Sequence, residues 1–501
     1  MKIAFSRRAF LTSAAAMCLP GASLSAPPAV SLRPRARADA ATVAPAAAKP
    51  ARTAASLVQT ARLSGQTGAA VADAATGKMR DTVNAATALP PASVLKAITA
   101  LYALDALGAA HRFETRLLAT GPLEGDTLKG DLILAGGGDP TMDTDALADL
   151  ARRLAATGVK RITGRFLVWG GALPYQRQID PDQPDHVGYN PAISGLALNY
   201  NRVHFEWRRQ GQGWGVAMDA RSDSLRPAVR SARVAIVNRA LPIYTYADRD
   251  GVENWTVANA ALGKGGSRWL PVRRPDLYAA EVFRVLARDR GVTLPAEVRS
   301  DTAPQGRTLA ARVSDPLPVI LRDMLKFSTN LTAEMVGLAA SRARTGKLPA
   351  SLTASGAEMA RWSATTLGLS GHSFADHSGL SDASRITADG MVRALLTPAA
   401  QSALPALLKP VALRDAKGQV AQAHPLKAVA KTGTLNFASG LAGYITTPTG
   451  TRLAFAVFSV DATARARIKP EDRESAPGAA PWNGRAKRLQ QALIEAWGSA
   501  G

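Results

Sequence analysis

Two adjacent prolines, Pro90 and Pro91, directly precede the strongest helical pattern in the chain. Proline ends an extended segment and is tolerated in the first helical turn, where its missing N–H leaves no bond unmade. Apolar residues then recur on one stripe at helical spacing, at Val94, Ile98, Leu101 and Leu104. The sequence therefore predicts a helix over residues 94–110, with its first turn around Ser93.

The rest of the chain is long enough for two or three domains with packed cores, since it has 501 residues of which 47% are hydrophobic. Periodicity predicts a hairpin over 68–75 and 79–83, strands over 115–119, 131–135 and 161–169, helices over 144–156 and 277–289, mostly helices over 317–408, strands over 438–446 and 452–460, and a basic amphipathic helix over 485–497. We expect this last helix to pack on a sheet rather than on a membrane.

Ser93 and Lys96 lie three residues apart at the start of the first predicted helix, so their side chains fall on one face. The Ser93 hydroxyl is close to the positive end of the helix dipole, which favours a developing alkoxide. A desolvated lysine within hydrogen-bond reach can remove the hydroxyl proton. Ser93 and Lys96 are therefore a candidate nucleophile and base. The alternative interpretation is that Ser93 caps the helix and that Lys96 is a surface lysine one turn later.

Ser328 and Asn330 lie where a helix predicted over 316–326 meets another predicted over 331–344. The Ser328 hydroxyl can relay a proton between Lys96 and a departing amine, and the Asn330 amide can hold a substrate carbonyl. The same segment, Ser-Thr-Asn, is also good helix-capping chemistry, so by itself it does not decide between the two roles.

A predicted strand leads into Lys431, Thr432, Gly433 and Thr434. The glycine would let the backbone of a ligand approach closely. The ammonium and the two hydroxyls would then bind a carboxylate. An ordinary turn between strands is the alternative for this segment.

In chain order these segments form the set S-x-x-K, S-x-N and K-T-G, which is typical of penicillin-binding proteins and class A β-lactamases. Lys96 and Ser328 are 232 positions apart, far more than a β-lactamase uses, so an insert must separate the first two motifs. Residues 130–141, 190–199 and 376–381 resemble segments of class C low-molecular-mass penicillin-binding proteins. The resemblance covers residues 65–460, and His377 stands where that family usually has glycine.

The resemblance to this D-alanyl-D-alanine carboxypeptidase/endopeptidase family implies an α/β fold. A transpeptidase/β-lactamase-like domain, an antiparallel sheet flanked by helices, is expected to be interrupted by a large, mainly β insert of one or two subdomains. The implied catalytic domain comprises residues 53–111 and 305–501, and the implied insert comprises residues 112–304.

The same resemblance implies a serine D,D-peptidase that forms an acyl-enzyme on Ser93. Ser93 would attack the carbonyl of the penultimate D-alanine with Lys96 as general base, and Ser328 and Lys431 would pass a proton to the departing amine. Asn330 would complete the catalytic set. Either carboxypeptidase action on D-Ala-D-Ala termini or endopeptidase action on cross-links fits this reading.

The implied substrate contacts involve the third motif. Backbone N–H groups of Ser93 and Thr434 would form the oxyanion hole. Lys431, Thr432 and Thr434, around Gly433, would hold the terminal carboxylate. Peptidoglycan stem peptides are then the substrates and β-lactam antibiotics the covalent inhibitors, and no cofactor or metal is implied.

An acidic residue of the insert is expected to face the free amine of the stem peptide's diamino acid. The Pro-rich segment 180–185 is where the resemblance places such a residue, with Asp185 the first candidate and Asp182 the second. A solvated acidic loop is the alternative for this segment.

The sequence also bears on other function classes. The net charge of +22 comes from basic residues scattered along the chain, with only 5% aromatics, so nucleic-acid binding is not expected. A β-lactamase is the nearest alternative among enzymes, but the E-x-x-L-N motif of class A is absent from the sequence. A catalytically silent protein that binds acidic wall polymers is the alternative from another class, and such a protein has no need of Lys96.

The first residues resemble an export signal. Arg7 and Arg8 stand in the segment S-R-R-A-F-L, which is similar to the twin-arginine signal, and an apolar stretch over 9–20 and small residues at a cleavage site follow. A general secretory signal that happens to contain two arginines is the alternative. We expect residues 1–25 to be a signal peptide, residues 26–52 to be a flexible Ala/Pro/Arg-rich linker, and the mature protein to be periplasmic, without a transmembrane segment.

Overall fold

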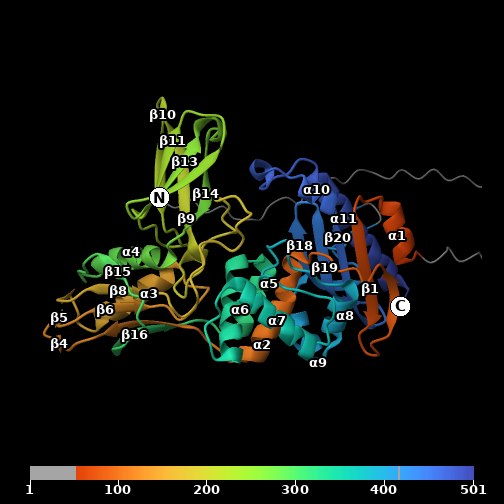
Figure 1. Cartoon of the computed structure of the whole chain (residues 1–501), viewed down its shortest axis with the longest axis horizontal. Coiled ribbons are helices and arrows are strands. Elements are labelled where there is room, and N and C mark those ends of the chain that lie inside the picture. Colours follow the sequence, from red (N-terminus) through yellow and green to blue (C-terminus); the bar gives the residue numbers. More distant parts are fainter. Residues whose placement is uncertain (1–51, 416–417, 501) are drawn as a thin grey trace, which may run out of the picture. The chain divides into compact units, whose positions relative to one another are not determined.

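The computed structural model of the chain describes residues 52–415 and 418–500. The predicted signal peptide, and the predicted linker apart from its last residue, lie outside the described residues. The central feature is an antiparallel six-stranded sheet in the order β17-β18-β19-β20-β1-β2 (Figure 1). Its strands are β1 (Gln66–Asp73), β2 (Met79–Val83), β17 (Lys409–Pro410), β18 (Lys427–Leu435), β19 (Ala438–Thr446) and β20 (Arg452–Val460).

The sheet joins the two ends of the sequence, because β1 pairs along its whole length with β20. Both faces of β20 are buried, and the two-residue period of a strand divides its side chains between two cores. Ala454, Ala456 and Phe458 enter the core on one face, whereas Phe455 and Val457 enter the core on the other. The hairpin and the two late strands expected from the sequence are confirmed, and the tertiary structure pairs them.

One face of the sheet is covered by helices. These are α2 (Leu95–Leu107), α5 (Leu317–Phe327), α6 (Asn330–Thr345), α7 (Leu352–Thr366), α8 (Ala388–Leu396) and α9 (Pro398–Leu407). The sequence predicted α2 as a helix with one apolar stripe, but every residue from Leu95 to Ala103 is buried. The reason is its central position, since α2 contacts α5, α6, α7 and α9 around its circumference.

The opposite face is covered by α1 (Ala54–Ala61) and α11 (Ala479–Ser499) (Figure 1). Leu489, Leu493 and Trp497 of α11 pack in one core with Phe455 and Val457 of the sheet. The expectation that the basic C-terminal helix packs on a sheet is therefore confirmed, although the helix begins six residues earlier than predicted. Within the part of the chain that the structure describes, no helix has both the length and the hydropathy to cross a bilayer.

The insert contains a five-stranded sheet in the order β15-β8-β6-β3-β16, with two helices. These elements are β3 (Glu114–Ala119), β6 (Leu132–Ala135), β8 (Phe166–Trp169), β15 (Glu297–Arg299), β16 (Arg307–Val313), α3 (Thr144–Ala156) and α4 (Pro275–Arg288). A small sheet beside it consists of β4 (Leu123–Glu124), β5 (Thr127–Leu128) and β7 (Arg161–Ile162). The single strand predicted over 161–169 is therefore two strands, β7 and β8, which belong to different sheets.

The remaining part of the insert consists of two three-stranded sheets, β10-β9-β14 and β11-β13-β12. Their strands are β9 (Arg202–Gln210), β10 (Gly213–Asp219), β11 (Ala232–Val237), β12 (Tyr244–Arg249), β13 (Val252–Ala258) and β14 (Gly265–Pro271). Strand β16 returns from the insert and pairs with β3, so it completes the insert's own sheet. We therefore propose that the insert ends near Val313 rather than at residue 304.

Candidate active site

The first motif lies in a tight turn that leads into α2. Residues Ala92–Val94 form a single 3-10 turn, and the α-helix proper begins at Leu95. Ala92 has a φ of +46°, a left-handed conformation that costs a residue with a side chain about 1–2 kcal/mol. Such strain is typical of functional sites, where the surrounding structure holds it in place. The turn leaves Ser93 half-buried at the edge of a cavity.

Lys96 lies beneath this turn with none of its surface exposed. Its Nζ lies 3.0 Å from Ser93 Oγ, 2.7 Å from Asn330 Oδ1 and 2.8 Å from the carbonyl oxygen of Ser378. The predicted hydrogen bond between the serine and lysine of the first motif is therefore present. The Asn330 amide is oriented by its Nδ2, which donates to the Tyr189 carbonyl of the insert at 3.0 Å.

These contacts define what Lys96 can do chemically. The oxygens of Asn330 and Ser378 can only accept, so Lys96 donates one hydrogen to each. A neutral amine has two hydrogens, and its lone pair is then left for the third direction, toward Ser93 Oγ. Burial lowers the pKa of Lys96 below its ordinary 10.5, while the carboxylates of Glu334 and Asp376 partly raise it. The site therefore favours a lysine that can accept the proton of Ser93.

The second motif occupies the two-residue connection between α5 and α6. Ser328 ends α5 in a left-handed conformation, with a φ of +60°, and α6 begins at Asn330. This sharp turn brings the side chains of Ser328 and Asn330 to the same cavity. Lys431 of the third motif donates to Ser328 Oγ at 2.9 Å, which links the second motif to the sheet.

The third motif lies on β18. Lys431 is almost fully buried, and burial, together with the charges of Lys96 and Lys409, lowers its pKa to about 6. Thr432 is exposed, and Thr434 lines the cavity. The sequence predicted that Gly433 makes room for a ligand. The structure shows a further reason for glycine at this position, because a Cβ at Gly433 would lie 2.8 Å from the Pro91 carbonyl and 3.1 Å from Ser93 N. The glycine makes room for the turn of the first motif.

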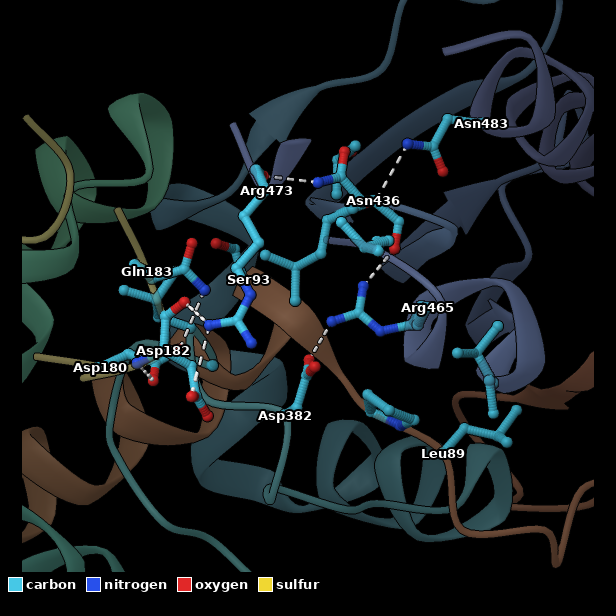
Figure 2. A pocket seen from close by; sticks show the side chains of 18 of the residues that line it. Leu89, Ser93, Asp180, Asp182, Gln183, Asp382, Asn436, Arg465, Arg473 and Asn483 are labelled. Atoms are coloured by element: carbon cyan, nitrogen blue, oxygen red, sulfur yellow. Dashed lines mark hydrogen bonds and ion pairs between the residues drawn. The ribbon is translucent and has the colours of Figure 1, made fainter. Parts of the chain in front are cut away.

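The three motifs thus meet at one cavity of about 760 Å³, which Ser93, Ser328, Asn330 and Thr434 line. Figure 2 shows Ser93 in this cavity with Asp180, Asp182 and Gln183 of the insert on one side. On another side Arg465 lies between Asp382 and the Asn436 carbonyl (Figure 2).

The acidic segment does not present its residues as the sequence suggested. Among the described residues, Asp180, Asp182 and Gln183 line the cavity, and Asp185 is not one of them. The Asp185 carboxylate instead lies 3.6 Å from Arg177 and 3.7 Å from Arg273. The Asp182 side chain is 79% exposed and lies 3.4 Å from Arg473. Of the two candidates, the second, Asp182, is the one at the cavity.

Sequence comparison assigns the chain to a family. The model of the D-Ala-D-Ala carboxypeptidase 3 (S13) family matches residues 51–476. The chain belongs to this family. The D-alanyl-D-alanine carboxypeptidase of Actinomadura sp. (strain R39) is 28% identical over 427 residues, which cover 78% of this chain and 77% of the relative. The D-alanyl-D-alanine carboxypeptidase DacB of Haemophilus influenzae is 26% identical over 407 residues, covering 75% and 81%.

The fold comparison agrees with this assignment to the S13 family. The crystal structure of penicillin binding protein 4 (dacB) from Haemophilus influenzae superimposes with a TM-score of 0.71 at 21% identity, covering 88% of this chain and 99% of that one. A second crystal structure of the same protein, in complex with a β-lactam, gives a TM-score of 0.68 at 20% identity, with the same coverage. The predicted fold class, a transpeptidase-like domain with an insert, is confirmed.

Three buried residues of this S13 member were not recognised as site residues from the sequence: Glu334, Asp376 and Ser378. Asp376 and Ser378 belong to the segment 376–381, and the resemblance of this segment to the family implies no role for either residue. Glu334 is the one charged residue of the run L-T-A-E-M-V-G-L in α6, and it follows Asn330 by one helical turn. A lone acid in such a run was the signal that could have found it.

His377 is also buried, but its contacts are those of a core residue and not of a catalytic one. Its Nε2 lies 2.8 Å from Ser355 Oγ, and its ring stacks on Tyr102 at 6.2 Å between centroids. Burial lowers the pKa of His377 to about 3, so the ring is neutral at ordinary pH. This side chain therefore fills a space in the core and carries no charge there.

Proposed function

We propose that this S13 family member is a serine D,D-peptidase that forms an acyl-enzyme on Ser93. Its substrates are the D-Ala-D-Ala termini of peptidoglycan stem peptides, the D-Ala-diamino acid cross-links, or both. One observation carries the proposal: Nζ of buried Lys96 lies 3.0 Å from Ser93 Oγ, while the acceptor oxygens of Asn330 and Ser378 lie at 2.7 and 2.8 Å. A neutral Lys96 that gives its two hydrogens to these acceptors has its lone pair left for Ser93.

Acylation follows from this arrangement. Ser93 Oγ attacks the carbonyl carbon of the penultimate D-alanine, and its proton passes to Lys96 Nζ. Backbone N–H groups of Ser93 and Thr434 stabilise the oxyanion, a contribution of roughly 100- to 1,000-fold per donor in comparable sites. The C–N bond then breaks, the departing amine receives a proton through Ser328 and Lys431, and Ser93 carries the acyl group.

Deacylation uses water in the place of the departed amine. Water attacks the acyl carbonyl and gives up a proton to the same lysine and serine groups, which regenerates Ser93 with its hydroxyl. Lys431, Thr432 and Thr434 hold the terminal carboxylate, and β18 supports their position. Strand β17 pairs only with Val429 and Ala430 among the described residues, so the edge of β18 from Lys431 onward is left for a substrate.

The side-chain amine of the substrate's diamino acid is assigned to Asp182. Its carboxylate lies at the cavity, on the insert side, and is largely exposed to an incoming ligand. Asp185, which the sequence favoured, is assigned instead to the ion pairs with Arg177 and Arg273 that support the loop. The substrate subsite is therefore built by the insert.

The protein is further proposed to be exported to the periplasm by the twin-arginine route, with residues 1–25 removed. This part of the proposal is supported by the sequence signal alone. It fits a substrate that is a polymer of the cell wall.

A fluorescent penicillin tests the reaction class. The protein should be labelled covalently, and Ser93→Ala should abolish labelling while the thermal unfolding temperature stays close to that of the wild type. Rapid loss of the label with repeated turnover would indicate a β-lactamase, and no labelling of the wild type would indicate a silent wall-binding protein. Mass analysis of digested muropeptides then separates the two reactions: loss of one alanine marks a carboxypeptidase, and resolved dimers mark an endopeptidase.

A further inference from the structure

Glu334 is a fully buried carboxylate that the proposed reaction does not use. It lies on α6, one turn after Asn330, and none of its surface is exposed. Both of its oxygens accept backbone hydrogens: His377 N donates to one at 2.9 Å, and Ser378 N donates to the other at 2.9 Å. A carboxylate placed in this way fixes two consecutive peptide groups at once.

The peptide groups that Glu334 fixes lead directly to Lys96. The carbonyl of Ser378 accepts from Lys96 Nζ at 2.8 Å, and the carbonyl of His377 accepts from the Thr99 hydroxyl at 2.6 Å. The segment is therefore held by its N–H groups against α6 and by its carbonyl groups against α2. The Ser378 carbonyl belongs to the next peptide, 378–379, so a shift of the backbone at His377 and Ser378 would carry this carbonyl away from Lys96.

A second buried carboxylate holds the following turn. Asp376 accepts from Gly379 N at 3.0 Å, from Ser381 N at 2.8 Å and from Ser384 Oγ at 3.2 Å. This contact network leaves the segment 376–381 few alternative conformations, and Glu334 is its link to α6. Buried hydrogen-bond networks of this kind depend on every member, because an unsatisfied buried N–H is costly.

Helix α6 thus controls both of the acceptors that orient Lys96. Asn330 contacts Nζ directly at 2.7 Å, and Glu334, four residues later on the same face, acts through the Ser378 carbonyl. If either acceptor moved, Lys96 would no longer have its lone pair confined to the direction of Ser93.

We propose that Glu334 is a positioning residue, whose carboxylate holds the 377–378 peptide so that the Ser378 carbonyl orients Lys96 toward Ser93. The inference rests on the proposed function, in which Lys96 is the base. Burial raises the pKa of Glu334, and the groups that share its surroundings are Lys96 on α2, and Asp376 and His377 on the facing loop. The charge of Lys96 also acts on Lys431 of β18.

The test is Glu334→Gln, assayed by the rate of acylation with a penicillin across pH. Glutamine keeps the shape but has one acceptor oxygen, and its NH₂ group meets a backbone N–H. The plateau rate at high pH should fall roughly 10- to 100-fold, as misplaced catalytic groups do. The inflection of the plot of acylation rate against pH should also move to lower pH, because a buried negative charge near Lys96 no longer stabilises the protonated form of Lys96.

Glu281→Gln is the matched control. Glu281 is a buried carboxylate on α4 of the insert, and its two oxygens accept from Arg230 N at 2.7 Å and Ser231 N at 3.0 Å. The same substitution there should lower the unfolding temperature, yet leave the acylation rate and its pH profile unchanged. A Glu334→Gln protein that loses stability in the same way but acylates as the wild type does would overturn the proposal.

Thr99→Val provides a second route if Glu334→Gln does not fold. It removes the hydroxyl that holds the His377 carbonyl from the α2 side, and no charge changes. The acylation rate should fall several-fold with no shift of the inflection, and an unchanged rate would count against the positioning role of this peptide. The wild type and Ser93→Ala are labelled in parallel, so failure of the proposed function, an unlabelled wild type, is distinguished from failure of this inference.

Discussion

The imidazole of His377 occupies the space that a side chain at position 337 would need. A Cβ on Gly337 of α6 would lie 2.1 Å from Cγ and 2.3 Å from Nδ1 of His377, distances that no packed core allows. The His377 ring cannot shift away from Gly337, because Ser355 and Met359 contact its two nitrogens. The glycine in the middle of a helix is thus explained by a histidine 40 positions away in the sequence.

Gly337→Ala should therefore destabilise the protein by about 1–3 kcal/mol, the usual cost of overpacking, in spite of alanine's better helix propensity. The double variant Gly337→Ala/His377→Gly should lose less stability than the sum of the two single variants, because the alanine methyl enters the space that the ring leaves. Urea unfolding of the four proteins measures this coupling. Strict additivity would show that the two positions do not compete for space.

The acylation rate should depend on the protonation of Lys96. Only the neutral amine can accept the Ser93 proton, and burial lowers the pKa of Lys96 below 10.5. The rate should therefore rise with pH and level off well below pH 10.5, as stopped-flow acylation with a β-lactam would show. Lys96→Arg should be inactive at every pH, because guanidinium does not lose its proton. A rate that rises only near pH 10.5 would contradict the lowered pKa of Lys96, and a Lys96→Arg protein that acylates as the wild type does would exclude Lys96 as the base.

Binding of a carboxylate should be coupled to proton uptake at Lys431. The pKa of Lys431 is lowered to about 6, so at pH 7.5 the unliganded side chain is mostly neutral. A bound carboxylate favours the ammonium form of Lys431 and raises its pKa. Binding therefore takes up a proton at any pH between the pKa of Lys431 in the free protein and its pKa in the complex. Calorimetric titration of the Ser93→Ala protein with an acylated D-Ala-D-Ala peptide, in buffers of different ionisation enthalpy, should show uptake approaching one proton. The additional substitution Lys431→Arg should remove it, and a heat independent of buffer would contradict the prediction.

Asp182 and Asp185 form a matched pair for the substrate amine. Asp182→Asn should lower the kcat/KM for peptides with a free side-chain amine by about three- to tenfold, a modest effect because the carboxylate is largely exposed to solvent. Acylation by a penicillin without an amine should be unchanged. Asp185→Asn in the same loop should leave both reactions nearly unchanged, since its carboxylate faces Arg177 and Arg273. A larger loss of kcat/KM in Asp185→Asn than in Asp182→Asn would assign the substrate amine to Asp185 instead.

Export should depend on the arginine pair near the start of the chain. Arg7→Lys together with Arg8→Lys keeps both charges but removes the guanidinium groups that a twin-arginine receptor distinguishes from ammonium. The double variant should accumulate in the cytoplasm, as cell fractionation with penicillin labelling would show. Normal periplasmic accumulation would indicate the general secretory route.

The local part of the site could be predicted from the sequence. Ser93 and Lys96 are neighbours because helical geometry brings positions three apart onto one face. Ser328 and Asn330 lie close together because only Thr329 separates them at the turn between two helices. The order of the motifs and the distance between Lys96 and Ser328 also indicated a catalytic domain with an insert. These relationships depend only on backbone periodicity and on the pattern of residue types.

The tertiary structure alone decided which distant groups surround these residues. Nothing local places Glu334 and Asp376 beneath Lys96, sets Gly433 against the turn of the first motif, or turns Asp182 toward the cavity and Asp185 away from it. Each of these contacts joins segments that are far apart in the sequence, and their meeting depends on how the helices pack on the sheet and how the insert folds back. A residue pattern specifies which surfaces are apolar, but the path of the whole chain determines which buried polar groups come to face one another.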